Sequence, residues 1–147
     1  MTILDIPQHE QHTDASAWTP VCRLVDLAPE RGAAALVDGE QVALFRLVDD
    51  TVRAVQQQDP FCGAFVLSRG IVGTRHVGDE VVATVASPMH KQVFDLRTGV
   101  CLDPVGKSPV AGLPADLRTW RVRVVDGVVE VAAHATPAVV DDEGSAG

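Results

Sequence analysis

The sequence contains few of the residues that define several classes of protein. It has no tyrosine, and only 4% of its 147 residues are aromatic. Its three cysteines, Cys22, Cys62 and Cys101, are odd in number and show no Cys-x-x-Cys spacing, which argues against a disulfide scaffold and favours a reducing compartment. Lysine and arginine number 12 against 20 acidic residues. The resulting net charge of -8 argues against partners such as nucleic acid or an anionic membrane surface.

Targeting and membrane-spanning signals are also missing. Residues 1–10 contain no basic region followed by an apolar stretch, so they do not resemble a signal peptide. No apolar run approaches the roughly 20 residues that cross a bilayer. We therefore expect a soluble, cytoplasmic protein.

The composition that remains is sufficient for one domain with a hydrophobic core. A hydrophobic fraction of 46% comes mainly from valine, leucine, alanine and isoleucine, a mixture that suits β-strands. Both ends lack apolar periodicity, and the C-terminal end carries Asp141-Asp142-Glu143. We expect mobile tails at residues 1–17 and 134–147 around a domain at 18–133.

Short apolar runs separated by tight turns predict strands. The pairs Asp38-Gly39 and Asp126-Gly127 favour type I′ turns, so they predict hairpins at 33–47 and 120–132. Further strands are expected at 51–55, 81–86, 93–95 and 100–102. Apolar and polar residues alternate along 120–125, as in a strand with one exposed face. No long segment has helical periodicity, so we predict an all-β sandwich of a single domain.

Two predicted loops carry the sequence features of an iron-sulfur site that has lost most of its ligands. They read Gln-Asp-Pro-Phe-Cys-Gly-Ala at 58–64 and Ser-Pro-Met-His-Lys-Gln-Val-Phe-Asp at 87–95. A Rieske centre takes Cys-x-His from one loop and Cys-x-x-His from another, because two thiolates hold one iron and two imidazoles the other. In this chain the four positions are Asp59, Phe61, Ser87 and His90. The prolines and glycines around the ligand positions remain, whereas three of the four ligands are replaced.

These loops, together with 66–73 (Val-Leu-Ser-Arg-Gly-Ile-Val-Gly) and Phe-Asp-Leu-Arg-Thr-Gly at 94–99, resemble the small subunit of bacterial assimilatory NAD(P)H-dependent nitrite reductase. The resemblance extends from about Trp18 to Ala132. It implies a Rieske-type β-sandwich with an incomplete ligand set and no cofactor in this chain. It also implies that FAD, siroheme and an ordinary iron-sulfur cluster belong to a large catalytic subunit, which would be the partner.

The ligand chemistry is consistent with this implication. Phe61 has no lone pair, and Asp59 and Ser87 are hard oxygen donors that replace thiolates poorly, so we expect no [2Fe-2S] cluster and no catalytic residue in this chain. An alternative is a mononuclear metal held by Asp59, Cys62 and His90. The competing interpretation makes Cys62 a partly buried turn residue and His90 a surface imidazole. The absence of compact ligand spacing favours the second interpretation.

The loops have two possible roles once the ligands are lost. They can dock against the large subunit, with Phe61 and Met89 as apolar anchors and Arg69 and Lys91 as orienting charges. Alternatively, Phe61 and Met89 turn inward and fill the space that a cluster would occupy. The sequence leaves both alternatives open.

The leading hypothesis is therefore a non-catalytic small subunit of an enzyme that reduces nitrite to ammonium. One alternative is a Rieske-type ferredoxin that carries electrons to an oxygenase, which requires a cluster. Another is a stand-alone protein-interaction module, which requires no reductase partner.

Overall fold

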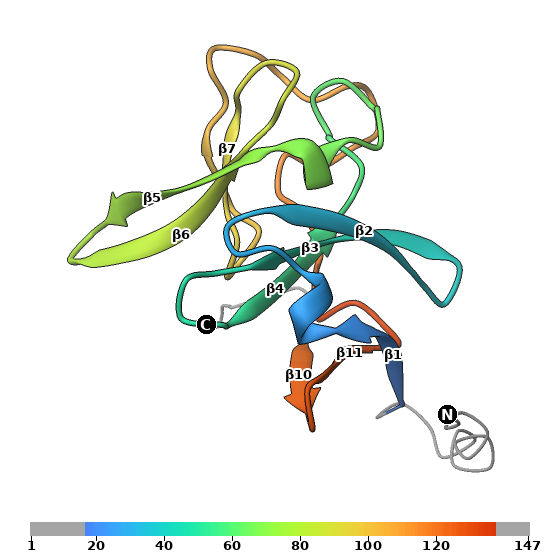
Figure 1. Cartoon of the computed structure of the whole chain (residues 1–147). Helices are drawn as coiled ribbons and strands as arrows, with labels where there is room; N and C mark the ends of the chain where they lie inside the picture. The colour runs from blue at the N-terminus through green and yellow to red at the C-terminus, as the bar shows by residue number, and fades with distance from the viewer. Residues whose placement is uncertain (1–16, 138–147) are drawn as a thin grey trace, which may run out of the picture.

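The computed structural model describes residues 17–137, and these residues form three antiparallel β-sheets (Figure 1). The first sheet contains β1 (Trp18–Arg23), β11 (Val128–Ala132) and β10 (Val122–Val125), in that order. The second contains β2 (Gly32–Val37), β3 (Glu40–Arg46), β4 (Val52–Gln56) and β9 (Thr119–Trp120). The third contains β5 (Ile71–Val77), β6 (Glu80–Ala86), β7 (Val93–Asp95) and β8 (Cys101–Asp103). The short 3-10 helices η2 (Leu24–Asp26) and η3 (Leu67–Arg69) lie between strands, and the all-β prediction is confirmed.

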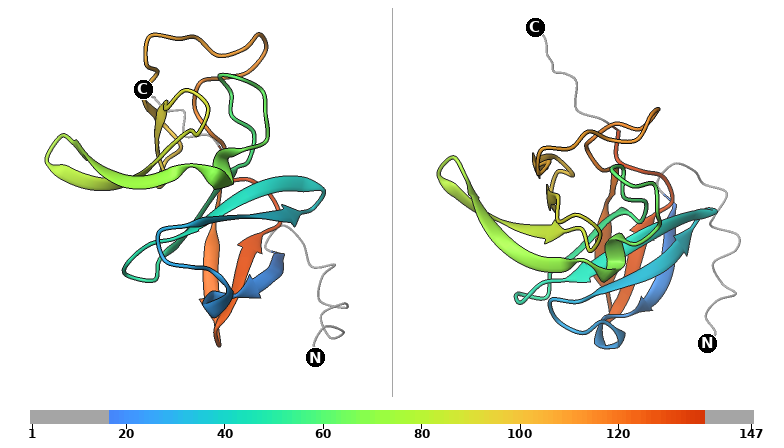
Figure 2. Two further views of the ribbon diagram at one scale, coloured as in Figure 1. Left: turned by 45° about the horizontal axis from the view of Figure 1, so that its top comes forward. Right: turned by 90° about the horizontal axis from the view of Figure 1, so that it is seen from above.

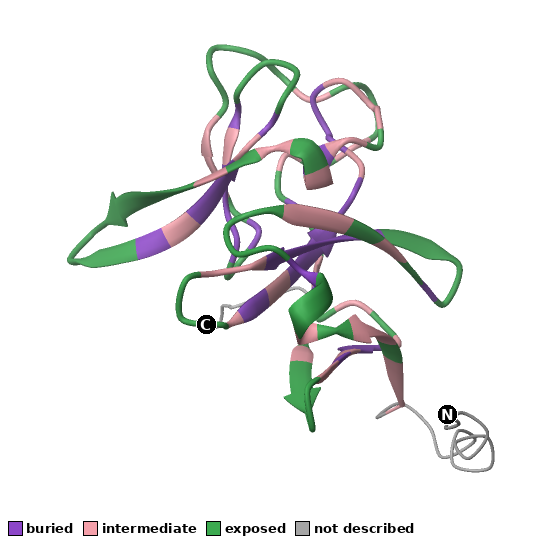
Figure 3. Cartoon of the chain, in the orientation of Figure 1, coloured by how far each residue is buried: buried purple, intermediate pink, exposed green. Residues whose placement is uncertain are grey.

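The second sheet is buried on both faces. On β3, Ala43 and Phe45 belong to a core cluster shared with the third sheet, whereas Val42 and Leu44 belong to a cluster shared with β11. Successive side chains of a strand point to opposite faces, so β3 lies between two apolar layers. Figure 3 shows the same burial along β3 and β4, in contrast with the exposed ends of the hairpins. The core therefore extends from the first sheet, through the second, to the two loops of interest.

The predicted Asp-Gly turns are present. Both residues of Asp38-Gly39 and of Asp126-Gly127 have positive φ angles, as a type I′ turn requires. They connect β2 to β3 and β10 to β11 in register, with Val37 opposite Glu40 and Val125 opposite Val128. These local signals correctly located two of the hairpins.

Two features of the sheets differ from the sequence-based prediction. The predicted strand at 120–125 is interrupted at Arg121, because Trp120 pairs with Ala54 of β4 whereas Val122 pairs with Val131 of β11. The segment therefore changes sheets within one strand-like run. The other difference is β5, which was not predicted because it has almost no buried residue to create a pattern. It pairs along its whole length with β6, and the hairpin extends away from the rest of the chain (Figure 2).

The tails predicted at 1–17 and 134–147 lie mostly outside the described residues. Residues 134–137 are described, and the backbone N–H of Thr136 donates to the carbonyl of Thr119 at 2.7 Å. Ala135 packs against the cluster that contains Trp120. The packed part of the chain thus continues a few residues past the predicted boundary. Between residues 17 and 137, no helix has both the length and the hydrophobicity needed to cross a membrane.

Trp120 gives a test of this arrangement, because its side chain is only 4% exposed between β4 and β11. We expect Trp120→Ala to lower the free energy of unfolding by about 3–5 kcal/mol, since it removes a large buried side chain and leaves a cavity. Val124→Ala, on the exposed β10, is the matched control and should cost about 0.5 kcal/mol or less. Urea denaturation of both variants measures the difference, and similar losses would contradict the burial of Trp120.

Candidate functional site: two loops without cluster ligands

The site is formed by two hydrogen-bonded loops, which we call loop 1 (residues 58–64, after β4) and loop 2 (residues 87–92, between β6 and β7). Loop 1 is closed by backbone bonds from Asp59 N–H to the Ala64 carbonyl and from Gly63 N–H to the Asp59 carbonyl, at 2.8 and 2.7 Å. Loop 2 is closed by bonds from Ser87 N–H to the Gln92 carbonyl and from Lys91 N–H to the Ser87 carbonyl. Each loop is therefore held in shape by its own backbone.

Two glycines have distinct roles around the loops, one in backbone conformation and one in close packing. Gly63 has a φ of 83°, a conformation that residues with a Cβ adopt at a cost. Gly70, which ends η3, has no room for a side chain, because a Cβ there would lie 2.5 Å from the carbonyl oxygen of Ala86. This contact holds Arg69 beside the end of β6, immediately before Ser87. Gly70 thus brings the segment after loop 1 against the start of loop 2.

A buried side-chain hydrogen bond joins the two loops. The hydroxyl of Ser87 donates to Oδ2 of Asp59, and both side chains are almost completely buried. The other carboxylate oxygen of Asp59 accepts the N–H of Phe61 at 2.7 Å, and Ser87 Oγ accepts the N–H of Met89 at 3.1 Å. Each polar group thus has a partner, which is the condition for burying a carboxylate at acceptable cost. These are the two positions at which a Rieske centre has its cysteines.

The two remaining ligand positions have different surroundings. Phe61 is 7% exposed and packs in the core, with its ring centroid 6.1 Å from that of Phe94. His90 lies on the exposed part of loop 2. The structure therefore brings Asp59 and Ser87 together, packs Phe61 in the core, and leaves His90 at the surface.

This arrangement does not fit a [2Fe-2S] cluster. The side chains at the two cysteine positions bond to each other, and a phenyl ring packs into the core at one histidine position. Oxygen donors and a phenyl ring cannot provide the thiolate and imidazole ligands that such a cluster takes. These side chains therefore cannot hold a cluster that would relay electrons.

The alternative metal site is not assembled either. Among residues 17–137, no three histidine, cysteine or acidic side chains are grouped closely enough to hold a metal ion, so Asp59, Cys62 and His90 do not form a ligand set. Partial burial, and then the negative charge of Asp59, raise the pKa of the Cys62 thiol. A raised pKa disfavours the thiolate that metals bind.

The predicted interface residues divide into two groups. Arg69, Met89 and Lys91 are exposed, and Met89 is 51% exposed. Phe61 is not available at the surface, because it fills the core as the second sequence interpretation described. Phe61 therefore cannot be a docking residue, whereas Arg69, Met89 and Lys91 remain candidates for the interface.

An exposed aromatic residue next to loop 1 was not singled out from the sequence. Phe65 is 51% exposed, and its backbone forms an isolated antiparallel β-bridge with Gln58 across loop 1. Val110, which is 38% exposed, lies in a third loop whose backbone N–H at that residue donates to the Pro60 carbonyl at 2.9 Å. Figure 1 shows the three loops at the same end of the molecule. Phe65 could have been noticed as one of only four phenylalanines, although its exposure could not.

Removing the bond between the loops tests its importance. We expect Ser87→Ala to lower the free energy of unfolding by about 1–3 kcal/mol, because it leaves a buried carboxylate oxygen of Asp59 without its donor. Ser108→Ala, at an exposed position, should change it by about 0.5 kcal/mol or less. The two variants can be compared by urea denaturation with unchanged slope, and equal midpoints would contradict a stabilising role for the bond.

Comparison with known proteins places this geometry in a family. Residues 17–132 match the model of the Rieske-like [2Fe-2S] domain. The NADH nitrite reductase small subunit of Escherichia coli K12 is 38% identical over 117 residues, which are 79% of this chain and 97% of that protein. A nitrite reductase [NAD(P)H] large subunit of Klebsiella oxytoca is 34% identical over 124 residues, which are 84% of this chain but 12% of that protein.

Solved structures agree with these sequence matches. The NMR structure of the E. coli protein NirD is 36% identical and has a TM-score of 0.62, covering 78% of this chain and 94% of that one. The ferredoxin of carbazole 1,9a-dioxygenase from Nocardioides aromaticivorans IC177 is 25% identical with a TM-score of 0.60, covering 81% of this chain and all of that one. The chain belongs to the Rieske-like domain family and, within it, to the small subunits of NADH-dependent nitrite reductase.

Proposed function

We propose that this chain is the non-catalytic subunit of a cytoplasmic NAD(P)H-dependent nitrite reductase. In this proposal it docks on a large subunit that carries FAD, siroheme and an iron-sulfur cluster and reduces nitrite to ammonium. The observation that carries the proposal is the pair of loops joined by Asp59 and Ser87, in which a hydrogen bond links the two positions where a Rieske centre has its cysteines. Such a site can present a surface without relaying electrons.

A relative supports the association with a large subunit. In the Klebsiella oxytoca protein, the region that matches this chain is one part of a much longer large-subunit chain. A covalent link keeps the matching domain beside the rest of that protein. In the present protein, non-covalent docking would provide the same proximity.

We propose the end of the molecule that carries the loops as the docking surface. Phe65 and Met89 supply exposed apolar area there, and aromatic residues and methionine are enriched at interfaces. Arg69 and Lys91 add positive charges beside them, which would orient an approaching acidic surface. Phe61 contributes indirectly, because its packing against Phe94 anchors loop 1 to the core.

The ferredoxin alternative has the fold in its favour, because the carbazole dioxygenase ferredoxin superposes on this chain. It requires cluster ligands, however, and the residues at those positions are Asp59, Phe61, Ser87 and His90. The stand-alone module remains distinguishable by experiment, because it predicts no binding to a large reductase subunit.

The first prediction concerns cofactor content. We expect the purified chain to be colourless and to contain neither stoichiometric iron nor acid-labile sulfide, even when cluster-assembly proteins are co-expressed, because Asp59 and Ser87 stand at the two cysteine positions. Elemental analysis and visible absorption measure this, with a ligand-bearing Rieske ferredoxin prepared in parallel as control. A visible absorption band with a matching EPR signal after reduction would support the ferredoxin alternative instead.

The second prediction concerns docking. We expect the Phe65→Ala/Met89→Ala variant to bind the large subunit about 30-fold more weakly or worse, because truncating central interface residues typically costs about 2 kcal/mol or more. Leu36→Ala removes a comparable exposed side chain from β2 and should leave affinity unchanged. Titration of the large subunit, with a melting curve of each free variant, checks both expectations.

Lys91→Glu tests whether the charge of Lys91 orients the large subunit as it approaches, separately from the apolar contacts. The backbone at this position has a positive φ of 66°, which lysine and glutamate must both adopt. The substitution therefore mainly reverses a charge. We expect slower association with the large subunit, and a smaller difference at high salt where the charge is screened. Normal affinity of all these variants would place the partner surface elsewhere on the chain.

A further inference from the structure

A groove on another part of the chain gathers much of its positive charge. The groove has a volume of about 500 Å³ and is bordered by β4, β9, β10, the start of β1 and the turn after β7. Four arginines line it: Arg53, Arg97, Arg121 and Arg123. We call it the arginine groove. None of its lining residues lies in loop 1 or loop 2.

The charge of the arginine groove contrasts with that of the whole protein. Its four arginines are one third of the 12 basic residues in a chain whose net charge is -8. The one carboxylate among its lining residues is Asp50, which pairs with Arg46 at 2.9 Å. Positive charge is therefore concentrated in the groove and largely uncompensated by its own lining.

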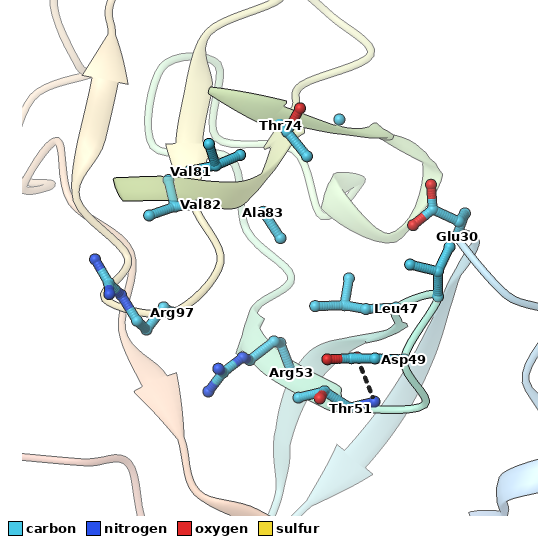
Figure 4. A pocket seen from close by; sticks show the side chains of 12 residues that line it. Glu30, Leu47, Asp49, Thr51, Arg53, Thr74, Val81, Val82, Ala83 and Arg97 are labelled. Carbon is cyan, nitrogen blue, oxygen red and sulfur yellow. Dashed lines mark hydrogen bonds between the residues drawn. The ribbon is translucent and has the colours of Figure 1, made fainter. Parts of the chain in front are cut away.

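Two of the four guanidinium groups have no ionic partner in the described part of the chain. Arg97 pairs with Glu80 at 2.9 Å and Arg123 with Glu130 at 2.6 Å. Between residues 17 and 137, Arg53 and Arg121 have no carboxylate within ion-pair distance. Figure 4 shows that Arg53 and Arg97, which come from separate segments, also line an adjoining pocket of about 440 Å³. Unpaired arginines with a shared opening are suited to carboxylates from outside.

Both tryptophans of the chain contribute to the walls. The guanidinium of Arg123 lies over the ring of Trp18, 4.4 Å from its centroid. Stacking of this kind fixes the planar group and reduces the entropy lost when it binds a carboxylate. Arginine and tryptophan are also the residue types that dominate binding energy at protein interfaces. The groove thus combines charge with rigid apolar surface.

The backbone along one wall is an open strand edge. Among residues 17–137, β10 is the last strand of its sheet and has β11 as its one strand partner. Residues 121–124 all line the groove in succession, although alternate side chains of a strand point to opposite faces. The wall therefore includes the edge of β10 itself, where unpaired backbone groups can accept an added strand.

We propose that the arginine groove binds an acidic, extended segment of a partner protein, which lies along the edge of β10 and places its carboxylates against the four arginines. Backbone bonds to β10 would supply affinity, and the arginines would select for acidic side chains. Small apolar side chains of the segment would face Val124 and Trp18. This surface is separate from the loops, so it does not depend on the docking proposed above.

The test uses the full chain and a fluorescent ten-residue peptide of alternating glutamate and valine. We expect Arg53→Gln/Arg121→Gln to weaken binding about 10-fold or more, because two charge-assisted contacts are lost while no ion pair of the described chain is broken. Arg31→Gln/Lys107→Gln changes the net charge equally at exposed positions outside the groove and should leave affinity unchanged. Equal weakening by the two variants would mean non-specific attraction and would overturn the proposal, provided that melting temperatures are unchanged.

Two further probes test the geometry and the occupant. N-methylation of alternate peptide residues should abolish binding if the peptide adds to β10, and unaltered binding would overturn strand addition. The chain's own acidic residues give the competing occupant, because Thr136 lines the groove and Asp141-Asp142-Glu143 follow in the sequence. Replacing these three by Asn, Asn and Gln in the full chain should leave peptide affinity unchanged. A tenfold gain in affinity would identify the chain's own tail as the occupant and overturn the proposal of a partner segment.

Discussion

The hydrogen bond between Ser87 and Asp59 is the contact on which the candidate site depends. In a Rieske domain, shared iron ligands connect the two loops, and without them the loops would need another connection to remain apposed. Here the Asp59 carboxyl group accepts hydrogen bonds from both the Ser87 hydroxyl and the Phe61 N–H, so one buried side chain fixes the position of two loops. Because each oxygen has a donor, burial costs far less than it would for an isolated carboxylate.

The core beneath the loops makes this replacement possible. The second sheet is apolar on both faces, and the cluster on its loop side includes Phe45, Phe61 and Phe94. A phenyl ring at position 61 fills volume in a core that tolerates few voids. The loops therefore rest on packing and backbone hydrogen bonds, which require no metal. A retained loop surface is the consequence, and it is available for contact with another protein.

Local signals in the sequence predicted some of these features, but features that depend on contacts between distant residues were not predicted. Asp-Gly pairs specify their turns directly, so both hairpins followed from composition at two positions. The break at Arg121 could not be predicted in this way, because it depends on the pairing of Trp120 with Ala54 of β4, which lies 66 positions earlier in the chain. The sequence left the direction of Phe61 undecided, since an aromatic residue suits a core and an interface equally. Only the packing against Phe94 resolves it.

The arginine groove was least accessible to sequence analysis, because its four arginines come from three segments that are far apart in the sequence. It also changes what the overall charge means. A chain with net charge -8 repels acidic partners at long range. Screening limits each charge to about 8–10 Å at physiological salt, so an acidic segment feels mainly the charges nearest to it. Attraction of the acidic segment would then be confined to the groove, and repulsion by the rest of the surface would exclude other binding orientations. The contrast in charge would therefore make binding specific to the groove.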